Sequence, residues 1–133
     1  MAWTDKYIGI PFQPNGRDFK ALDCWGLACL IYKEEKNIIL PDYLNVFRAN
    51  ERENLKEVAE IMNRDRHTLK NVDYSKRREF DIIILRSGSY IWHVGIILDL
   101  DTMIHVSEGT NVGIEKYTGC LWGNRIEDIR RPK

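Results

Sequence analysis

The segment that decides the fold, residues 23–35, reads DCWGLACLIYKEE. The carboxylate of Asp23 is a good N-cap for a helix. Leu27, Leu30 and Ile31 follow it at helical spacing, and the charged residues that come next end the apolar face. We therefore expect a helix that begins directly after Asp23 and buries its apolar face against the rest of the protein.

Cys24 occupies the first turn of this helix. Aligned peptide dipoles and unpaired backbone N–H groups favour negative charge there, which should stabilise a thiolate. A thiolate is the nucleophile that cysteine hydrolases need. Gly26, two residues on, should let another backbone or a substrate approach closely. The plainer alternative is a small buried cysteine that only packs, because free cysteine is often an inert core residue.

The last third of the chain changes to the pattern of β-strands. Short β-branched or apolar runs, separated by Gly, Ser and Asp, predict strands over residues 80–86, 93–98, 103–106, 112–117 and 126–131. Upstream, helical spacing predicts a short first segment over residues 2–9 and a surface helix over residues 51–63. Helices followed by consecutive short strands predict an α+β fold with an antiparallel sheet.

Two of the three histidines, His93 and His105, fall in neighbouring predicted strands. In an antiparallel hairpin turning at residues 99–102, His105 lies opposite His93 or Gly95, and alternation sends both rings to one face. The rings would then be within about 5–8 Å, close enough for one to orient the other. We expect the sulfur of Cys24 to face this pair across that side of the sheet, as in a catalytic triad. The alternative is two unrelated histidines, one on the surface and one in the core.

Composition limits the class of protein. The 133-residue chain is the size of one domain, which we expect to span residues 1–133. Twenty Lys and Arg balance twenty Asp and Glu, which argues against a nucleic-acid partner. No apolar run approaches the ~20 residues that cross a bilayer, and the N-terminus lacks the apolar core of a signal peptide. We therefore expect synthesis in the cytoplasm, no export by the usual route and no membrane insertion.

The cysteines favour neither disulfides nor a metal. Cys24, Cys29 and Cys120 are too few and too scattered for a disulfide framework. A zinc site built from Cys24, His93, His105 and Cys120 has suitable ligand types, but no CxxC or HxxxH pair supplies the local spacing. We therefore expect no metal and no organic cofactor, with zinc as the alternative that remains to be tested.

Four motifs together resemble the NlpC-type cysteine peptidases of cell-wall peptidoglycan. They are YIGIPFQPNGRDFKALDCWGL (residues 7–27), HVGIIL (93–98), MIHVSEG (103–109) and RIEDIRRP (125–132). The version with DCWGL and an arginine-rich ending is most similar to the branch associated with phage and prophage tails. The likeness covers residues 7–132 apart from the central stretch 45–76.

The resemblance implies a reduced papain-like α+β fold, with the nucleophile helix packed on the antiparallel sheet. It implies Cys24 as the nucleophile, His93 as the general base and His105 as the polar residue that orients the base. The backbone N–H of Cys24 would form part of the oxyanion hole, with Asp23 and Trp25 at the oxyanion and substrate pocket. Members of the family typically hydrolyse the amide between D-glutamate and the diamino acid of the stem peptide.

The sequence departs from the family at Phe12. Many members carry a tyrosine there, whose hydroxyl points into the oxyanion region, so the pocket of this chain is expected to lack that donor. Losing one oxyanion donor elsewhere costs roughly two to three orders of magnitude in rate. Two functions therefore stay open. One is a cysteine endopeptidase acting on peptidoglycan peptides. The other is a tail or tail-tip structural component with the same fold and a degenerate site. Both would have phage tail proteins as partners and a place on the virion.

Overall fold

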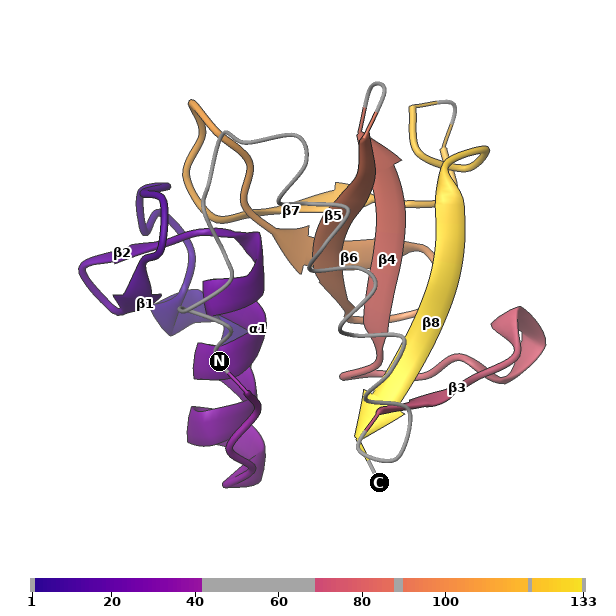
Figure 1. Ribbon diagram of the computed structural model, residues 1–133, viewed down its shortest axis with the longest axis horizontal. Coiled ribbons are helices and arrows are strands. Elements are labelled where there is room, and N and C mark those ends of the chain that lie inside the picture. The colour runs from indigo at the N-terminus through magenta and orange to yellow at the C-terminus, as the bar shows by residue number, and fades with distance from the viewer. Residues whose placement is uncertain (1, 42–68, 88–89, 120, 133) are drawn as a thin grey trace.

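The computed structural model describes residues 2–41, 69–87, 90–119 and 121–132 (Figure 1). The helical segments are η1 (Trp3–Lys6), α1 (Cys24–Ile31), η2 (Tyr32–Lys36) and η3 (Tyr74–Lys76). The strands are β1 (Arg17–Asp18), β2 (Ala21–Leu22), β3 (Leu69–Asn71), β4 (Ile82–Ser87), β5 (Tyr90–Ile97), β6 (Thr102–His105), β7 (Gly113–Lys116) and β8 (Ile126–Pro132). None of the helices in these ranges is long and apolar enough to span a membrane.

The helix α1 begins where its cap predicts. Asp23 Oδ1 accepts a hydrogen bond from the backbone N–H of Gly26 at 2.7 Å, which satisfies one of the free donors of the first turn. After Ile31 the helical conformation continues through the π-helical turn η2 and ends at Asn37. The left-handed backbone of Asn37, with φ of 55°, is the conformation that ends many helices.

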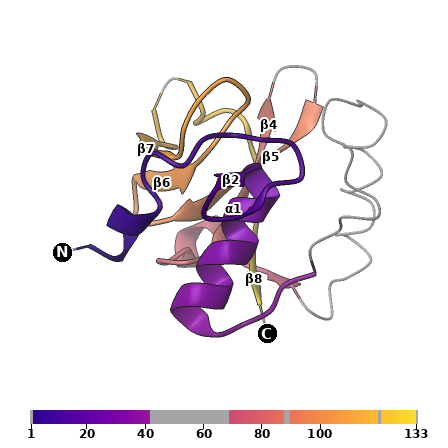
Figure 2. The same ribbon diagram turned by 90° about the vertical axis from the view of Figure 1, so that its left-hand side faces the viewer.

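Six strands form one antiparallel sheet in the order β3-β8-β4-β5-β6-β7. Figure 1 shows β8, β4 and β5 side by side, with α1 standing next to the sheet, and Figure 2 shows α1 in front of these strands. The short strands β1 and β2 make a separate two-stranded sheet at the start of α1. The predicted α+β fold, with one helix packed on an antiparallel sheet, is confirmed.

Both faces of the sheet are covered by apolar side chains. One group, the helix-side cluster, joins α1 to even-numbered strand positions and includes Leu27, Ile31, Ile82, Ile84, Val94, Ile96 and Ile104. The other, the far-side cluster, joins odd-numbered strand positions to two side chains between β7 and β8. It includes Ile83, Leu85, Ile97, Met103, Tyr117 and Trp122. Strands buried on both faces read as continuous apolar runs, which is why this part of the sequence shows little alternation.

The structure differs from the sequence-based prediction mainly in short elements. Each of the five predicted strands is present with shifted ends, and β5 begins at Tyr90 rather than at residue 93. The strands β1, β2 and β3 were not predicted, because two or three residues are too few to show a period. The first segment is a single 3-10 turn, η1. The helix predicted over residues 51–63 lies outside the described residues.

Substitution of Gly26 tests how closely the first turn of α1 packs against the preceding loop. A Cβ added at this position would stand 1.9 Å from the carbonyl oxygen of Gly16, so a side chain forces the first turn away from the preceding loop. We expect Gly26→Ala to lower the free energy of unfolding by about 1–3 kcal/mol, the usual cost of overpacking. Urea unfolding measures the change.

The matched control is Gly113→Ala, because the nearest atom to a Cβ there is 3.8 Å away. Equal unfolding midpoints for the two variants would contradict the close approach at Gly26.

Candidate active site

Cys24 is the first residue of α1, and its partly buried side chain lies where α1 meets β5. The backbone N–H groups of Trp25 and Val94 lie close enough to its sulfur to act as hydrogen-bond donors. The pairing of β5 with β6 ends at Gly95 and His105. The N–H of Ile97 bonds toward β4, so the N–H of even-numbered residues of β5 faces the β6 side. The sulfur therefore takes the place of a strand partner beside Val94.

His93 and His105 are hydrogen-bonded to each other. Nε2 of His93 lies 2.7 Å from Nδ1 of His105, and the ring centroids are 5.0 Å apart. His105 lies opposite Gly95, which is one of the two registers that the sequence predicts. Leu85 lies opposite His93 and belongs to the far-side cluster, so both rings project from the same face. The structure thus brings the two imidazoles together as expected.

The position of the sulfur relative to this face differs from the expectation. The two histidines project from the face opposite α1, whereas Val94 and Ile96 pack beneath the helix. The sulfur therefore lies beside the backbone of Val94, where the β5–β6 pairing ends, and not across the face that carries the two rings. The histidine face is also covered, because Trp122 stacks on His93 with ring centroids 5.2 Å apart and planes 14° apart.

Glu115 is hydrogen-bonded to the histidine pair. It is not among the site residues predicted from the sequence. Its Oε1 lies 2.8 Å from Nε2 of His105, and the indole N–H of Trp122 donates to the same oxygen at 2.9 Å. Glu115 lies opposite Met103 in the β6–β7 register, which places it on the face that carries His105. The available signal in the sequence was that Glu115 is odd-numbered, like the two histidines, so that alternation could place it on the same face. A charged residue in a four-residue strand gives no apolar pattern to reveal it.

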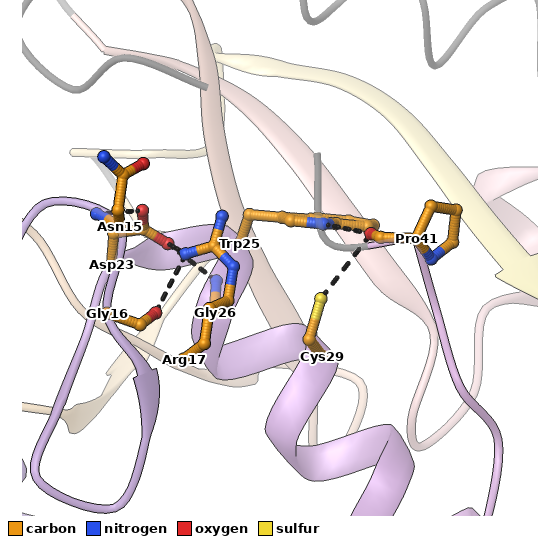
Figure 3. Close-up of polar contacts among 8 residues, drawn as sticks. All are labelled: Asn15, Gly16, Arg17, Asp23, Trp25, Gly26, Cys29 and Pro41. Atoms are coloured by element: carbon orange, nitrogen blue, oxygen red, sulfur yellow. Dashed lines mark hydrogen bonds and ion pairs between the residues drawn. The ribbon is translucent and has the colours of Figure 1, made fainter. Parts of the chain in front are cut away.

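Asp23 holds the loop before the helix instead of lining a pocket (Figure 3). It is 1% exposed. Its Oδ1 accepts hydrogen bonds from the N–H of Gly26 and from Nη1 of Arg17, the latter at 2.6 Å, and its Oδ2 accepts from the N–H of Asn15 at 2.9 Å. Arg17 also donates to the carbonyl oxygen of Gly16 at 2.8 Å. Asp23 therefore fixes the conformation of the backbone on both sides of Cys24.

Trp25 is also placed differently from the expectation. Its side chain is fully buried, and its Nε1–H donates to the carbonyl oxygen of Pro41 at 2.8 Å (Figure 3). The backbone amide of Trp25 lies close to the sulfur. Phe12 is partly buried against the helix-side cluster and bridges to Leu22, two residues before the nucleophile. A phenyl ring has no donor, so this position supplies no side-chain hydrogen bond.

The resting thiol is neutral. Burial, followed by the nearby carboxylate of Asp23, raises the pKa of Cys24 to about 12. The N–H groups of Val94 and Trp25 and the guanidinium of Arg17 lower the pKa, but by less. The shift runs opposite to the sequence-based expectation of a stabilised thiolate. Desolvation is its largest cause.

The two histidines are neutral as well. Burial, together with His105, lowers the pKa of His93 to about 3. Burial also lowers the pKa of His105, although Glu115 opposes this shift. Nε2 of His93 is engaged with His105, so Nδ1 is the nitrogen left to accept a proton from another group. An imidazole whose second nitrogen is held by a neighbouring polar group is suited to act as a general base.

The zinc alternative finds no support in this geometry. The facing nitrogens of His93 and His105 are at hydrogen-bonding distance, which leaves no room for an ion between them. Within the ranges that the structure describes, no group of three or more His, Cys, Asp or Glu side chains is arranged to hold a metal. Cys120, the fourth ligand considered, lies outside those ranges. The absence of an organic cofactor stays a prediction.

Comparison with known protein families gives a match over almost the whole chain. The model of the NlpC/P60 family matches residues 9–131. Among curated proteins, the murein DD-endopeptidase MepS/murein LD-carboxypeptidase of Escherichia coli K12 is 25% identical over 123 residues, covering 92% of this chain and 56% of that protein. Its counterpart from Escherichia coli O157:H7 gives the same values. The chain therefore spans little more than half the length of these curated relatives.

Solved structures with the same fold belong to the same group. An NlpC/P60 family protein from Bacillus cereus ATCC 10987 superposes with a TM-score of 0.67 at 19% identity, covering 95% of this chain and 36% of that one. The NlpC/p60 domain of the peptidoglycan hydrolase SagA gives a TM-score of 0.62 at 21% identity, covering 98% of this chain and 92% of that one. These likenesses establish the fold.

The raised pKa of Cys24 predicts its reactivity. Because the thiol stays protonated, iodoacetamide should alkylate Cys24 more slowly than free cysteine at about pH 7, and the rate should still be rising above about pH 9. Peptide mass spectrometry separates Cys24 from Cys29 and Cys120. Alkylation of Cys24 faster than free cysteine near neutral pH would show a stabilised thiolate and overturn the neutral resting state.

Proposed function

Because the chain belongs to the NlpC/P60 family, we propose that it is a cysteine endopeptidase that hydrolyses amide bonds in peptidoglycan stem peptides. The observation that supports the proposal is a hydrogen-bonded histidine pair on β5 and β6, together with the backbone N–H of Val94, next to His93 in sequence, at the sulfur of Cys24. MepS, described as a murein endopeptidase, and SagA, described as a peptidoglycan hydrolase, support the same substrate class.

In the proposed reaction Cys24 is the nucleophile and His93 the general base. The thiol proton moves to Nδ1 of His93, and the sulfur attacks the carbonyl carbon of the scissile amide. Backbone N–H groups at the start of α1, including that of Cys24, stabilise the oxyanion. Protonated His93 then gives its proton to the leaving amine, and the C–N bond breaks to leave a thioester.

Water completes the cycle. His93 takes a proton from water, the resulting hydroxide attacks the thioester carbon, and the C–S bond breaks. The leaving thiolate recovers the proton from His93, which restores the resting pair and releases the new carboxylic acid. His105 accepts a hydrogen bond from the base and keeps its ring oriented through both steps. Because thiol and imidazole are both neutral at rest, charge separates only while the oxyanion is present to balance it.

For the bond cleaved, we propose the amide between D-glutamate and the diamino acid. The resemblance of the motifs around Cys24, His93 and His105 to NlpC-type peptidases supports this choice. MepS is described instead as a DD-endopeptidase and LD-carboxypeptidase, so bonds further along the stem peptide are the competing outcome. Mass spectrometry of the released fragments identifies the bond directly.

We also propose that the protein is carried on phage or prophage tails. Support comes from DCWGL at residues 23–27 and from the arginine-rich ending at residues 125–132, which resemble the tail-associated branch. Tail particles purified after prophage induction should contain its peptides by mass spectrometry. Particles without these peptides, from a lysate that contains the protein, would contradict the association.

Turnover provides the direct test of the site. Purified peptidoglycan or a stem-peptide fragment should be cleaved by the wild-type protein, and Cys24→Ala should reduce the rate by about 10³-fold or more, since removing a nucleophile abolishes covalent catalysis. Cys29→Ala is the matched control, because Cys29 lies on the same helix and its sulfur lies 3.7 Å from the carbonyl oxygen of Pro41 (Figure 3). Product release is followed by chromatography.

The outcomes separate the two functions. Equal product from the wild type and from Cys24→Ala would remove Cys24 from the mechanism. No product from either protein, on substrate that another peptidase cleaves, would favour the structural tail component with a degenerate site. The missing hydroxyl at Phe12 is the observation that favours this second function.

A further inference from the structure

We propose that Glu115 is a positioning residue that fixes which nitrogens of the histidine pair carry protons, and so leaves Nδ1 of His93 free to act as the base. The inference rests on the proposed function, in which His93 accepts the proton of Cys24. Its evidence is the continuous row of hydrogen bonds from the carboxylate through both rings, and not the family resemblance.

The row has two links. Oε1 of Glu115 lies 2.8 Å from Nε2 of His105, and Nδ1 of His105 lies 2.7 Å from Nε2 of His93. An ionised carboxylate can only accept hydrogen bonds, so Nε2 of His105 carries a proton. A neutral imidazole has one N–H, so Nδ1 of His105 is bare and accepts from Nε2–H of His93. His93 is neutral too, and its Nδ1 is therefore left without a proton.

The opposite arrangement puts two acceptors against each other. If Nδ1 of His93 carried the proton, its Nε2 would have to accept from Nδ1–H of His105. Nε2 of His105 would then be bare and would face the oxygen of Glu115 at 2.8 Å. Such a contact has no hydrogen and is repulsive, because both atoms present lone pairs. Glu115 therefore disfavours the one tautomer in which His93 cannot accept the thiol proton.

Burial keeps both rings in the state that the argument needs. His93 is 5% exposed, and burial lowers the pKa of each histidine, so neither ring is an imidazolium at neutral pH. Trp122 holds the carboxylate in place, since its indole N–H donates to the same Oε1 while its ring stacks on His93. The side chain of Glu115 is itself 39% exposed, so replacing it leaves no large cavity.

The test compares Glu115→Leu, which removes the acceptor, with Glu115→Gln, which keeps an acceptor oxygen without the charge. Glu127→Leu is the matched control, because that carboxylate is 38% exposed and its ion pair is with Arg86 instead of a histidine. Nitrogen-15 NMR of the imidazole rings at about pH 7, assigned with His93→Gln, reports the tautomers. We expect protonated Nε2 and bare Nδ1 on His93 in the wild type, in Glu115→Gln and in Glu127→Leu, and a mixture in Glu115→Leu.

The catalytic rates of the variants should follow their tautomers. We expect Glu115→Leu to lower kcat about 10- to 100-fold with KM nearly unchanged, by analogy with the carboxylates that orient metal-binding histidines, whose loss costs about that much. Glu115→Gln should restore most of the rate. A purely structural role would not be rescued in this selective way, and it would not change the tautomer.

The outcomes for Glu115 and for the peptidase activity are independent. If the wild type hydrolyses nothing, the proposed function fails, and a tautomer change in Glu115→Leu still supports the role of Glu115. A Glu115→Leu protein with wild-type tautomers and wild-type kcat overturns the inference. If Glu115→Leu does not fold, the wild-type spectrum alone decides. A protonated Nδ1 on His93 would overturn the inference.

Discussion

The early end of the β5–β6 pairing is the constraint on which the site depends. Pairing stops at Gly95 and His105, so the N–H of Val94 has no strand partner and faces the sulfur of Cys24 instead. If β6 continued along β5, the start of α1 could not approach the strand edge. The same interruption leaves His105 as the last residue of its strand, free to turn its ring toward His93. The same early end of the pairing thus positions the three residues that the proposed reaction uses, Cys24, His93 and His105.

The electrostatics of the site follow from burial. Fixed dipoles at the start of α1 favour an anion, but they act on a sulfur that is desolvated and stands beside the capping carboxylate of Asp23. Arg17 offsets that carboxylate from the side of the preceding loop, at 2.6 Å. The carboxylate of Asp23 that caps the helix therefore also opposes ionisation of Cys24, and its ion pair with Arg17 reduces this effect. In the proposed reaction, a neutral thiol and a neutral imidazole exchange the proton only when the substrate is bound.

Much of the fold was readable from local patterns, and the missing parts need tertiary information. The Asp23 cap predicts the start of α1, and the alternation of side chains along strands predicts that His93 and His105 share a face. Alternation does not predict which face α1 covers, because both faces of β4 and β5 are apolar. The raised pKa of Cys24 depends on burial and on a folded neighbour, neither of which has a sequence signature. Glu115 was missed because its role depends on the β6–β7 register.

Trp122 makes two contacts at the histidine pair. Its ring stacks on His93 with centroids 5.2 Å apart, and its indole N–H donates to Oε1 of Glu115 at 2.9 Å. One side chain from the segment between β7 and β8 therefore fixes both an imidazole and a carboxylate. Loosening of that segment would release both groups together, so the order of the histidine pair depends on a turn that contains neither histidine.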